Sequence, residues 1–209
     1  ERRQPLHCNF EHFLNLVRLS FLSMPTYVLR TLSPLFCVAY RRSASLMALQ
    51  LIQKVLPSFL NLPPSSVPNT ELYPDLISIS QRIMQLPLSL GGLSLRLPDS
   101  IADIAYAASA TDSLPLLKIA ASRISVPFSY DLVPELRDTR SRIEAELPFI
   151  DLCFWMQIEN PDDEEYRDKP LQQLLTSVKN KAEIASIASL LEPWPVYLQA
   201  FSNRVDKDQ

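Results

Sequence analysis

Few side chains in this sequence stand at the spacings that chemistry requires. His7, Cys8 and His12 combine two imidazoles with a thiol, a donor set that zinc accepts. A fourth ligand and the usual ligand spacing are missing, and two histidines five residues apart point in different directions on a helix. We interpret them as ordinary surface or interface residues and predict no metal site.

The carboxylate pair Asp162 and Asp163 is a second candidate. Polymerases hold two divalent ions between neighbouring aspartates at a strand turn. Here the pair lies between Asn-Pro and Glu-Glu, with no apolar strand residues before it. This pattern favours a solvated acidic loop between helices.

Other catalytic patterns are also missing. The chain has two histidines, and neither lies in a recognisable Ser-His-Asp or Cys-His arrangement. Its two glycines, Gly91 and Gly92, are adjacent, whereas phosphate loops, dinucleotide-binding turns and nucleophile elbows need glycines spaced apart. We predict a structural turn at this pair, no catalytic residue and no cofactor, and therefore no enzymatic activity of the chain on its own.

Positive charge is concentrated near the N-terminus. Residues 1–60 carry seven Lys and Arg against two Glu, a net charge of +5, and the remaining residues carry 13 against 21 acids, a net of −8. Basic side chains on one helical lobe can bind the phosphate backbone of a nucleic acid without recognising its base sequence. The alternative is a solvated face that balances the acidic remainder. The candidate contact residues are Arg18, Arg30, Arg41, Arg42 and Lys54.

Helical spacing of apolar residues dominates the chain. Phe10, Phe13, Leu14, Val17 and Phe21 define one face of a helix. Prolines precede most later segments of this kind, where their missing N–H is harmless. The patterns predict helices over residues 10–21, from 26, over 36–56 and 73–85, from 98, and over 115–124, 131–146, 148–158, 170–179, 181–191 and 194–204, with a capping box at Asn180 and Glu183.

Two segments divide this helical pattern. Residues 88–97 alternate apolar and polar residues around the glycine pair, which predicts a tight hairpin or a sharp loop. Residues 61–70 are rich in Pro, Ser and Asn and form the one clear linker. We expect a mainly α protein, a multi-helix bundle in two packed lobes. The basic lobe comprises residues 1–62, and the second lobe, residues 63–209, contains the Gly-Gly turn.

The aromatic residues near the C-terminus could in principle stack on nucleic-acid bases. They stand at helical spacing among apolar neighbours, which favours core positions over stacking platforms. The residues are Phe154, Trp155, Trp194 and Tyr197.

Cysteine usage and hydropathy indicate the compartment. Cys8, Cys37 and Cys153 are odd in number and far apart, which argues for reduced thiols. No apolar run near 18 residues and no signal-peptide pattern occur. We predict an intracellular chain without a membrane partner. Because it begins at Glu1 without an initiator methionine, we expect it to be part of a longer protein.

Three segments carry a resemblance to a known family. Residues 86–96 read Leu-Pro-Leu-Ser-Leu-Gly-Gly-Leu-Ser-Leu-Arg, residues 102–109 read Ala-Asp-Ile-Ala-Tyr-Ala-Ala-Ser, and residues 24–34 read Met-Pro-Thr-Tyr-Val-Leu-Arg-Thr-Leu-Ser-Pro. Over about residues 10–117 the chain resembles the region downstream of the catalytic palm in reverse-transcriptase-like proteins of non-LTR retrotransposons. Ser94 stands where that family usually has a third glycine, and the sequence has no Phe/Tyr-Ala-Asp-Asp palm motif.

The resemblance implies a non-catalytic thumb and post-thumb fragment. Such a fragment would contact RNA or an RNA–DNA duplex through Arg18, Arg30, Arg41 and Arg42, or pack against the absent palm of the parent polyprotein. One alternative is an all-helical module that binds another protein through apolar helix faces and does not bind nucleic acid, and another is a decayed copy without function. First-lobe arginines gathered on one face favour nucleic-acid binding, and arginines that are scattered or paired with the acidic half favour the protein-binding module.

Overall fold

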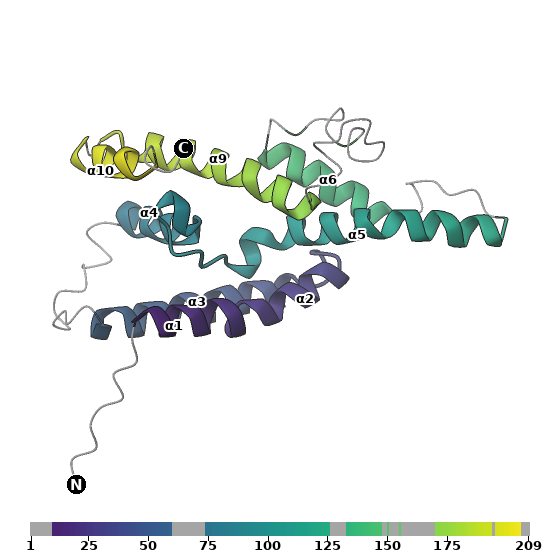
Figure 1. The fold of residues 1–209 in the computed structure, drawn as a ribbon, viewed down its shortest axis with the longest axis horizontal. Helices are drawn as coiled ribbons and strands as arrows, with labels where there is room; N and C mark the ends of the chain where they lie inside the picture. The colour runs from purple at the N-terminus through teal and green to yellow at the C-terminus, as the bar shows by residue number, and fades with distance from the viewer. Residues whose placement is uncertain are drawn as a thin grey trace, which may run out of the picture. The chain divides into compact units, whose positions relative to one another are not determined.

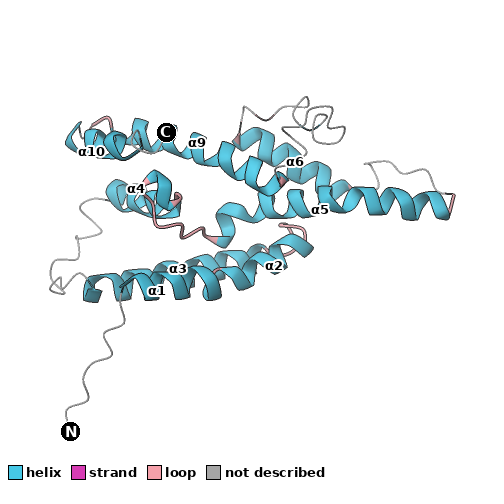
Figure 2. Ribbon diagram, viewed as in Figure 1, coloured by secondary structure: helices cyan, strands magenta, loops and turns pink. Residues whose placement is uncertain are grey.

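A computed structural model describes residues 10–59, 74–125, 133–147, 150, 155, 170–193 and 195–205. These residues are mostly helical and include no strand (Figure 2), which confirms the prediction of a mainly α protein. The predicted linker, residues 61–70, lies outside the described residues.

Figure 1 shows the helices: α1 (Phe10–Leu16), the π-helix η1 (Val17–Phe21), α2 (Ser23–Thr31), α3 (Val38–Phe59), α4 (Pro74–Gln85), the 3-10 helix η3 (Leu88–Leu90), α5 (Pro98–Arg123), α6 (Pro134–Glu146), α9 (Leu171–Leu191) and α10 (Pro195–Val205).

Proline begins several of these helices. Pro74, Pro98 and Pro134 are the first residues of α4, α5 and α6, which confirms the predicted role of these three prolines. The first N–H groups of a helix have no intrahelical acceptor, so a proline there sacrifices no hydrogen bond.

Two predicted helix boundaries are wrong. Helix α5 continues through Pro115, where a new helix was expected, and α9 continues through Asn180, where a capping box was expected. Leu114 is buried in the core beside Pro115, and Val178 and Ala182 pack against the same core on either side of Asn180. Tertiary packing stabilises both helices where the local sequence favours a break.

The glycine pair lies in a sharp loop and not in a hairpin. Gly91 ends η3 in the left-handed conformation, with φ 74°. After it, the N–H groups of Leu93 and Leu95 both donate to the Met84 carbonyl, at 3.1 and 3.0 Å. The segment after the loop is therefore held against the end of α4. The alternation of residues 88–97 corresponds to η3, the loop and an irregular segment, and to no strand among the described residues.

Gly92 is required by close backbone contact. A Cβ at this position would lie 2.6 Å from the Ile83 carbonyl oxygen and would collide with the carbonyl oxygen of Leu86. Both neighbours are backbone atoms of α4 and the residue that follows it, so neither can rotate away as a side chain does.

The chain divides into two compact units, each assembled from segments distant in sequence. Unit 1 comprises Glu1–Pro25, Ser43–Leu97 and Ile187–Gln209, and unit 2 comprises Thr26–Arg42 and Pro98–Ser186. This partition differs from the predicted lobes 1–62 and 63–209. Helices α2, α3 and α9 each contribute residues to both units, so the partition does not follow the linker.

Unit 1 has a core formed by α1, η1, α3 and the segment after the glycine loop. Its small member, Ala48, lets α3 approach the larger side chains around it. The buried residues are Leu14, Val17, Leu22, Ala48 and Leu95.

Unit 2 has two core clusters. In the larger one α5 packs along α6 (Figure 1), with buried residues that include Ala107, Ala108, Ile143 and Trp155. The smaller one joins α2 and the start of α3 to α5 and comprises Leu29, Cys37, Ala102 and Ala105. The two alanines carry small side chains, which allow the helices to approach closely.

The aromatic predictions have mixed outcomes. Trp155 is buried, as predicted, and its indole N–H donates to Glu144 Oε1 at 2.8 Å. The prediction for Tyr197 is wrong, because its side chain is exposed. Tyr197 lies in the first turn of α10, whose buried residues, Phe201 and Val205, come later in the helix. Phe154 and Trp194 lie outside the described residues.

Candidate nucleic-acid interface

Arg18 folds back onto its own helix. It lies in η1, half-buried, and its guanidinium donates to the Leu14 carbonyl at 3.3 Å and to Asn15 Oδ1 at 2.6 Å. The π-turn that carries it is closed by a hydrogen bond from Leu22 N–H to the Val17 carbonyl at 2.9 Å. Two of its donors are therefore occupied by local acceptors.

Arg30 lies near the end of α2 and is exposed, and it donates to the side-chain oxygen of Gln172 at the start of α9. Burial raises the pKa of the Asp112 carboxyl, and the charge of Arg30 lowers it in part. Arg30 therefore lies near two polar side chains of unit 2, those of Gln172 and Asp112.

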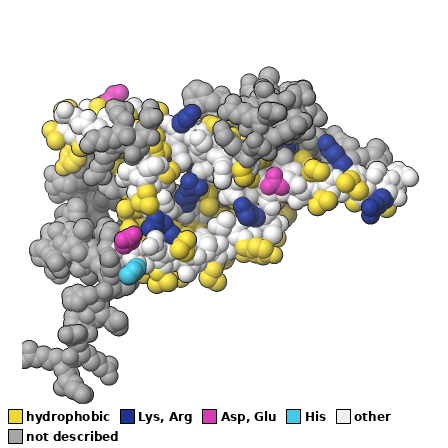
Figure 3. All heavy atoms as spheres, in the orientation of Figure 1, with side chains coloured by type: hydrophobic (Ala, Val, Ile, Leu, Met, Phe, Trp, Pro, Cys, Tyr) yellow, Lys and Arg dark blue, Asp and Glu magenta, His cyan; other side chains and the backbone are white. Residues whose placement is uncertain are grey.

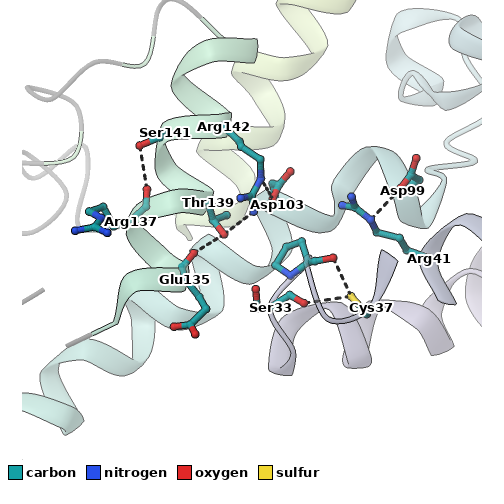
Figure 4. Close-up of polar contacts among 11 residues, drawn as sticks. Ser33, Cys37, Arg41, Asp99, Asp103, Glu135, Arg137, Thr139, Ser141 and Arg142 are labelled. Carbon is teal, nitrogen blue, oxygen red and sulfur yellow. Dashed lines mark hydrogen bonds and ion pairs between the residues drawn. The ribbon is translucent and has the colours of Figure 1, made fainter. Parts of the chain in front are cut away.

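Arg41 is tied to an acid of the same unit. Its Nε lies 3.0 Å from Asp99 Oδ1 (Figure 4), and the Arg41 side chain is only 16% exposed. Arg41 stands in the first turn of α3, where the positive end of the helix dipole disfavours a cation. Asp99 stands in the first turn of α5, where the dipole favours an anion, and the ion pair compensates Arg41.

Arg42 differs from these three arginines. Its side chain is exposed, and within the described part of the chain it makes no hydrogen bond or ion pair. Lys54 lies in α3, but its side chain is outside the described residues. Of the five predicted contact residues, Arg42 alone is described with a guanidinium available to a phosphate.

The five predicted contact residues are divided between the two units. Arg18 and Lys54 belong to unit 1, and Arg30, Arg41 and Arg42 belong to unit 2. Within unit 2, Arg30 and Arg41 are directed to different acceptors, Gln172 and Asp99. Of these two acceptors, Asp99 is an acid and Gln172 is uncharged.

One further cation was missed by the sequence reasoning. Arg96 follows the glycine loop, is half-buried, and makes no ion pair among the residues the structure describes. Burial lowers the pKa of its guanidinium. Its sequence position gave no signal, because in an alternating segment the residue between Leu95 and Leu97 is expected on the opposite, solvent-facing side.

A polar cluster joins α5 to α6 (Figure 4). Arg142 donates to Asp103 Oδ1 through Nη2 at 2.7 Å and Nε at 3.1 Å, and to Thr139 Oγ1 at 2.9 Å. The buried Thr139 hydroxyl in turn donates to the Glu135 carbonyl at 2.7 Å. These hydrogen bonds connect Asp103 of α5 to Arg142 and Thr139 of α6, and so orient the two helices.

No described group has the form of a metal or nucleophile site. Among the described residues, no three His, Cys, Asp or Glu side chains could hold a metal ion. His12 is exposed on α1, whereas His7, Cys8, Asp162 and Asp163 lie outside the description. The Cys37 thiol is buried and donates to the Ser33 carbonyl at 3.5 Å. Burial raises its pKa, which disfavours the nucleophilic thiolate.

Large apolar side chains are exposed on unit 2 at the turn before α3. Phe36 is 78% exposed, and Leu35 beside it and Tyr40 one helical turn later are exposed as well. The turn is fixed by a hydrogen bond from Phe36 N–H to the Ser33 carbonyl at 2.9 Å and by the inward position of Cys37. We call Leu35, Phe36 and Tyr40 the Phe36 surface.

No described helix is long and apolar enough to cross a membrane. The chain was compared with protein families, curated proteins and solved structures. No family model, no curated protein and no solved structure matches the chain.

Proposed function

We propose that this chain is a non-catalytic helical module that binds another protein through exposed apolar helix surfaces. The observation that carries the proposal is the Phe36 surface, with Phe36 78% exposed between Leu35 and Tyr40. Covering a side chain of this size contributes about 1.5–3 kcal/mol. Exposed apolar residues that adjoin one another are typical of interaction sites, whereas isolated ones need no explanation.

The state of the cations supports the same proposal. Binding of a nucleic-acid backbone needs several guanidinium or ammonium groups that face solvent on the same surface. Arg18, Arg30 and Arg41 are each engaged by groups of the chain itself. Given the resemblance to reverse-transcriptase-like proteins, the first partner to test is the polypeptide encoded upstream in the same open reading frame, which would include the palm.

A weak duplex contact is the second candidate function. It is favoured by Arg42, which is exposed without a described partner. One or two phosphate contacts release few counterions, so such binding would be weak and would decrease between low and physiological salt.

Two matched variants of the full chain test the proposal. Phe36→Glu removes the centre of the Phe36 surface, and Arg42→Glu reverses the one described free guanidinium among the predicted contacts. Both side chains are exposed, so both variants should fold like the wild type. The measurements are binding to the upstream polypeptide and fluorescence anisotropy with a short RNA–DNA hybrid and with single-stranded RNA at two salt concentrations.

We expect the upstream polypeptide to bind, Phe36→Glu to weaken that binding at least about tenfold, which corresponds to about 1.4 kcal/mol, and Arg42→Glu to leave it unchanged. The opposite pattern would overturn the proposal: salt-sensitive binding that prefers the duplex, is lost in Arg42→Glu and is retained in Phe36→Glu. In that case the thumb-like role is correct.

A further inference from the structure

Two exposed residues of the Phe36 surface each precede a residue that is fixed on the inside of unit 2. Phe36 is followed by Cys37, which is 4% exposed, and Tyr40 is followed by Arg41, whose side chain is 16% exposed. Successive residues of a helical turn point about 100° apart, so the direction of an inward residue sets the direction of the residue before it. Figure 3 shows apolar side chains at the surface over α2 and α3, at the lower edge of the view.

Cys37 is the apolar anchor of this segment. It lies in the smaller core cluster of unit 2, with Leu29 of α2 and two alanines of α5. The Ser33 carbonyl accepts a hydrogen bond from Phe36 N–H at 2.9 Å and another from the Cys37 thiol at 3.5 Å. One carbonyl therefore ties the exposed residue and the buried residue to the same turn.

Arg41 is the charged anchor. Its N–H donates to the Cys37 carbonyl at 2.9 Å, and residues four apart on a helix share a face, so both anchors point to the same side. On α5, Asp99 and Ala102 are three residues apart and share a face as well. The start of α3 thus meets α5 at two points, the apolar contact of Cys37 with Ala102 and the ion pair from Arg41 to Asp99 at 3.0 Å (Figure 4).

The second contact point has a consequence for the Phe36 surface. A single contact at Cys37 leaves the first turn of α3 free to rotate about it, whereas a second contact one turn later fixes the rotation. Residues that must meet a partner in one geometry need such support from the residues behind them. Tyr40, which adjoins Arg41, and Phe36, which adjoins Cys37, are both oriented by this pair of contacts.

We infer that the ion pair between Arg41 and Asp99 positions the Phe36 surface for its partner. Both residues are positioning residues, which act through Phe36 and Tyr40. The inference rests on the proposed function, because it concerns the same surface. A surface that is already held in its binding geometry loses less conformational entropy on binding, and one that is not held binds in proportion to the fraction of molecules that are correctly arranged.

The ion pair also makes this surface sensitive to salt. The Asp99 side chain is 45% exposed, so dissolved ions screen its attraction to Arg41. Burial of apolar surface involves no charge that salt could screen. Binding through the Phe36 surface should therefore weaken as the NaCl concentration rises, and it should weaken less in a variant that lacks the ion pair.

The test uses variants of the full chain. Asp99→Asn and Arg41→Gln remove the ion pair singly and together, and Arg41→Lys keeps the charge. The matched control is Asp138→Asn, which removes an exposed ion pair with Arg137 on α6 of the same unit. The measurements are hydrogen exchange of backbone amides by NMR, and binding of the upstream polypeptide at two NaCl concentrations.

We expect Asp99→Asn to speed exchange of the Phe36 and Arg41 amides at least about threefold, and to weaken binding by a similar factor, as for a partly exposed ion pair. The amides of Ala107 and Ala108, in the larger core of unit 2, should exchange as in the wild type. The double variant should bind no more weakly than Asp99→Asn, because one interaction is lost only once. Arg41→Lys should regain most of the binding that Arg41→Gln loses, and Asp138→Asn should change nothing.

Several outcomes would overturn the inference. Equal acceleration at Ala107 and Ala108 would show a general loss of stability in unit 2, and unchanged exchange at Phe36 would show that the ion pair does not order the surface. Unchanged binding and salt dependence in Asp99→Asn, while Phe36→Glu weakens the complex, would leave the proposed function standing and the inference wrong. If Phe36→Glu has no effect on the complex, the proposed function is wrong, and the exchange rates alone decide whether the ion pair orders the surface.

Discussion

Gly92 is the position at which a single methyl group would do most damage to unit 1. An added Cβ would collide with the carbonyl oxygens of Leu86 and Ile83. We expect Gly92→Ala to lower the free energy of unfolding by about 3 kcal/mol, the upper end of the range for overpacked sites. Gly91→Ala is the matched control, because the φ of 74° at this neighbouring glycine disfavours a side chain by about 1–2 kcal/mol. Urea unfolding measures both, and equal effects would contradict the close-contact explanation.

Ser94 occupies a backbone conformation that favours glycine. Its φ of 53° is left-handed, a conformation that a side chain disfavours, yet its hydroxyl accepts a hydrogen bond from Leu88 N–H at 3.2 Å. We expect Ser94→Gly to be near neutral, because relief of strain offsets the lost hydrogen bond. Ser94→Ala keeps the strain and loses the hydrogen bond, and should cost about 1 kcal/mol. Urea midpoints for both variants test this order, and a less stable Ser94→Gly would contradict it.

The partners of the arginines could not be read from the sequence. The charge count showed that the N-terminal segment is basic, but Gln172 lies 142 residues from Arg30, and no local pattern connects them. Arg41 finds Asp99 only because α3 and α5 pack in unit 2 through Cys37 and Ala102. Spacing identifies which residues share a helix face, and tertiary packing decides which of them remain available to a ligand.

At the scale of elements, Pro115 is the clearest test of packing against local preference. A proline inside a helix costs about 3 kcal/mol of folding free energy. Removing it also increases the entropy of the unfolded chain, which offsets about 1 kcal/mol of the gain in stability. We expect Pro115→Ala to raise the free energy of unfolding by about 1–2 kcal/mol, since the side chain is exposed. Thermal unfolding measures the change.

Pro134→Ala is the control for this prediction, because Pro134 begins α6, where proline is well tolerated. Its effect should be small or slightly destabilising. A loss of stability in Pro115→Ala would show that the packing of Leu114 depends on the proline, and would contradict the prediction.

Most helices were predictable and their interruptions were not. The apolar spacing from Phe10 to Phe21 and the prolines at 74, 98 and 134 mark real helices. The predicted break at Asn180 failed because Lys179 forms an ion pair with Glu146 while Val178 and Ala182 pack on the core. These contacts come from another helix, and a pattern read along one segment does not contain them.

At the scale of the whole molecule, the cores of both units combine residues from either side of residue 62. In unit 1, Leu14 and Ala48 pack with Leu95, and in unit 2, Leu29 packs with Ala105. We therefore expect fragments 1–62 and 63–209, expressed separately, to lack native structure, and to regain it when mixed. Circular dichroism and dispersion of NMR signals test this.

The two predicted lobes, residues 1–62 and 63–209, imply the opposite result, namely that each fragment folds on its own. If residues 63–209 alone unfolded cooperatively with the stability of the full chain, the two predicted lobes would be the real folding units. The partition by contacts would then describe packing but not independent folding.

The cause of the glycine requirement bears on how other sequences should be interpreted. At Gly92 the demand comes from two carbonyl oxygens of the chain itself, so it persists whether or not the protein retains any activity. A copy that had lost every partner would still be destabilised by a change there. The glycine at this position therefore reports how the backbone packs against the end of α4, and gives no information on a biochemical task.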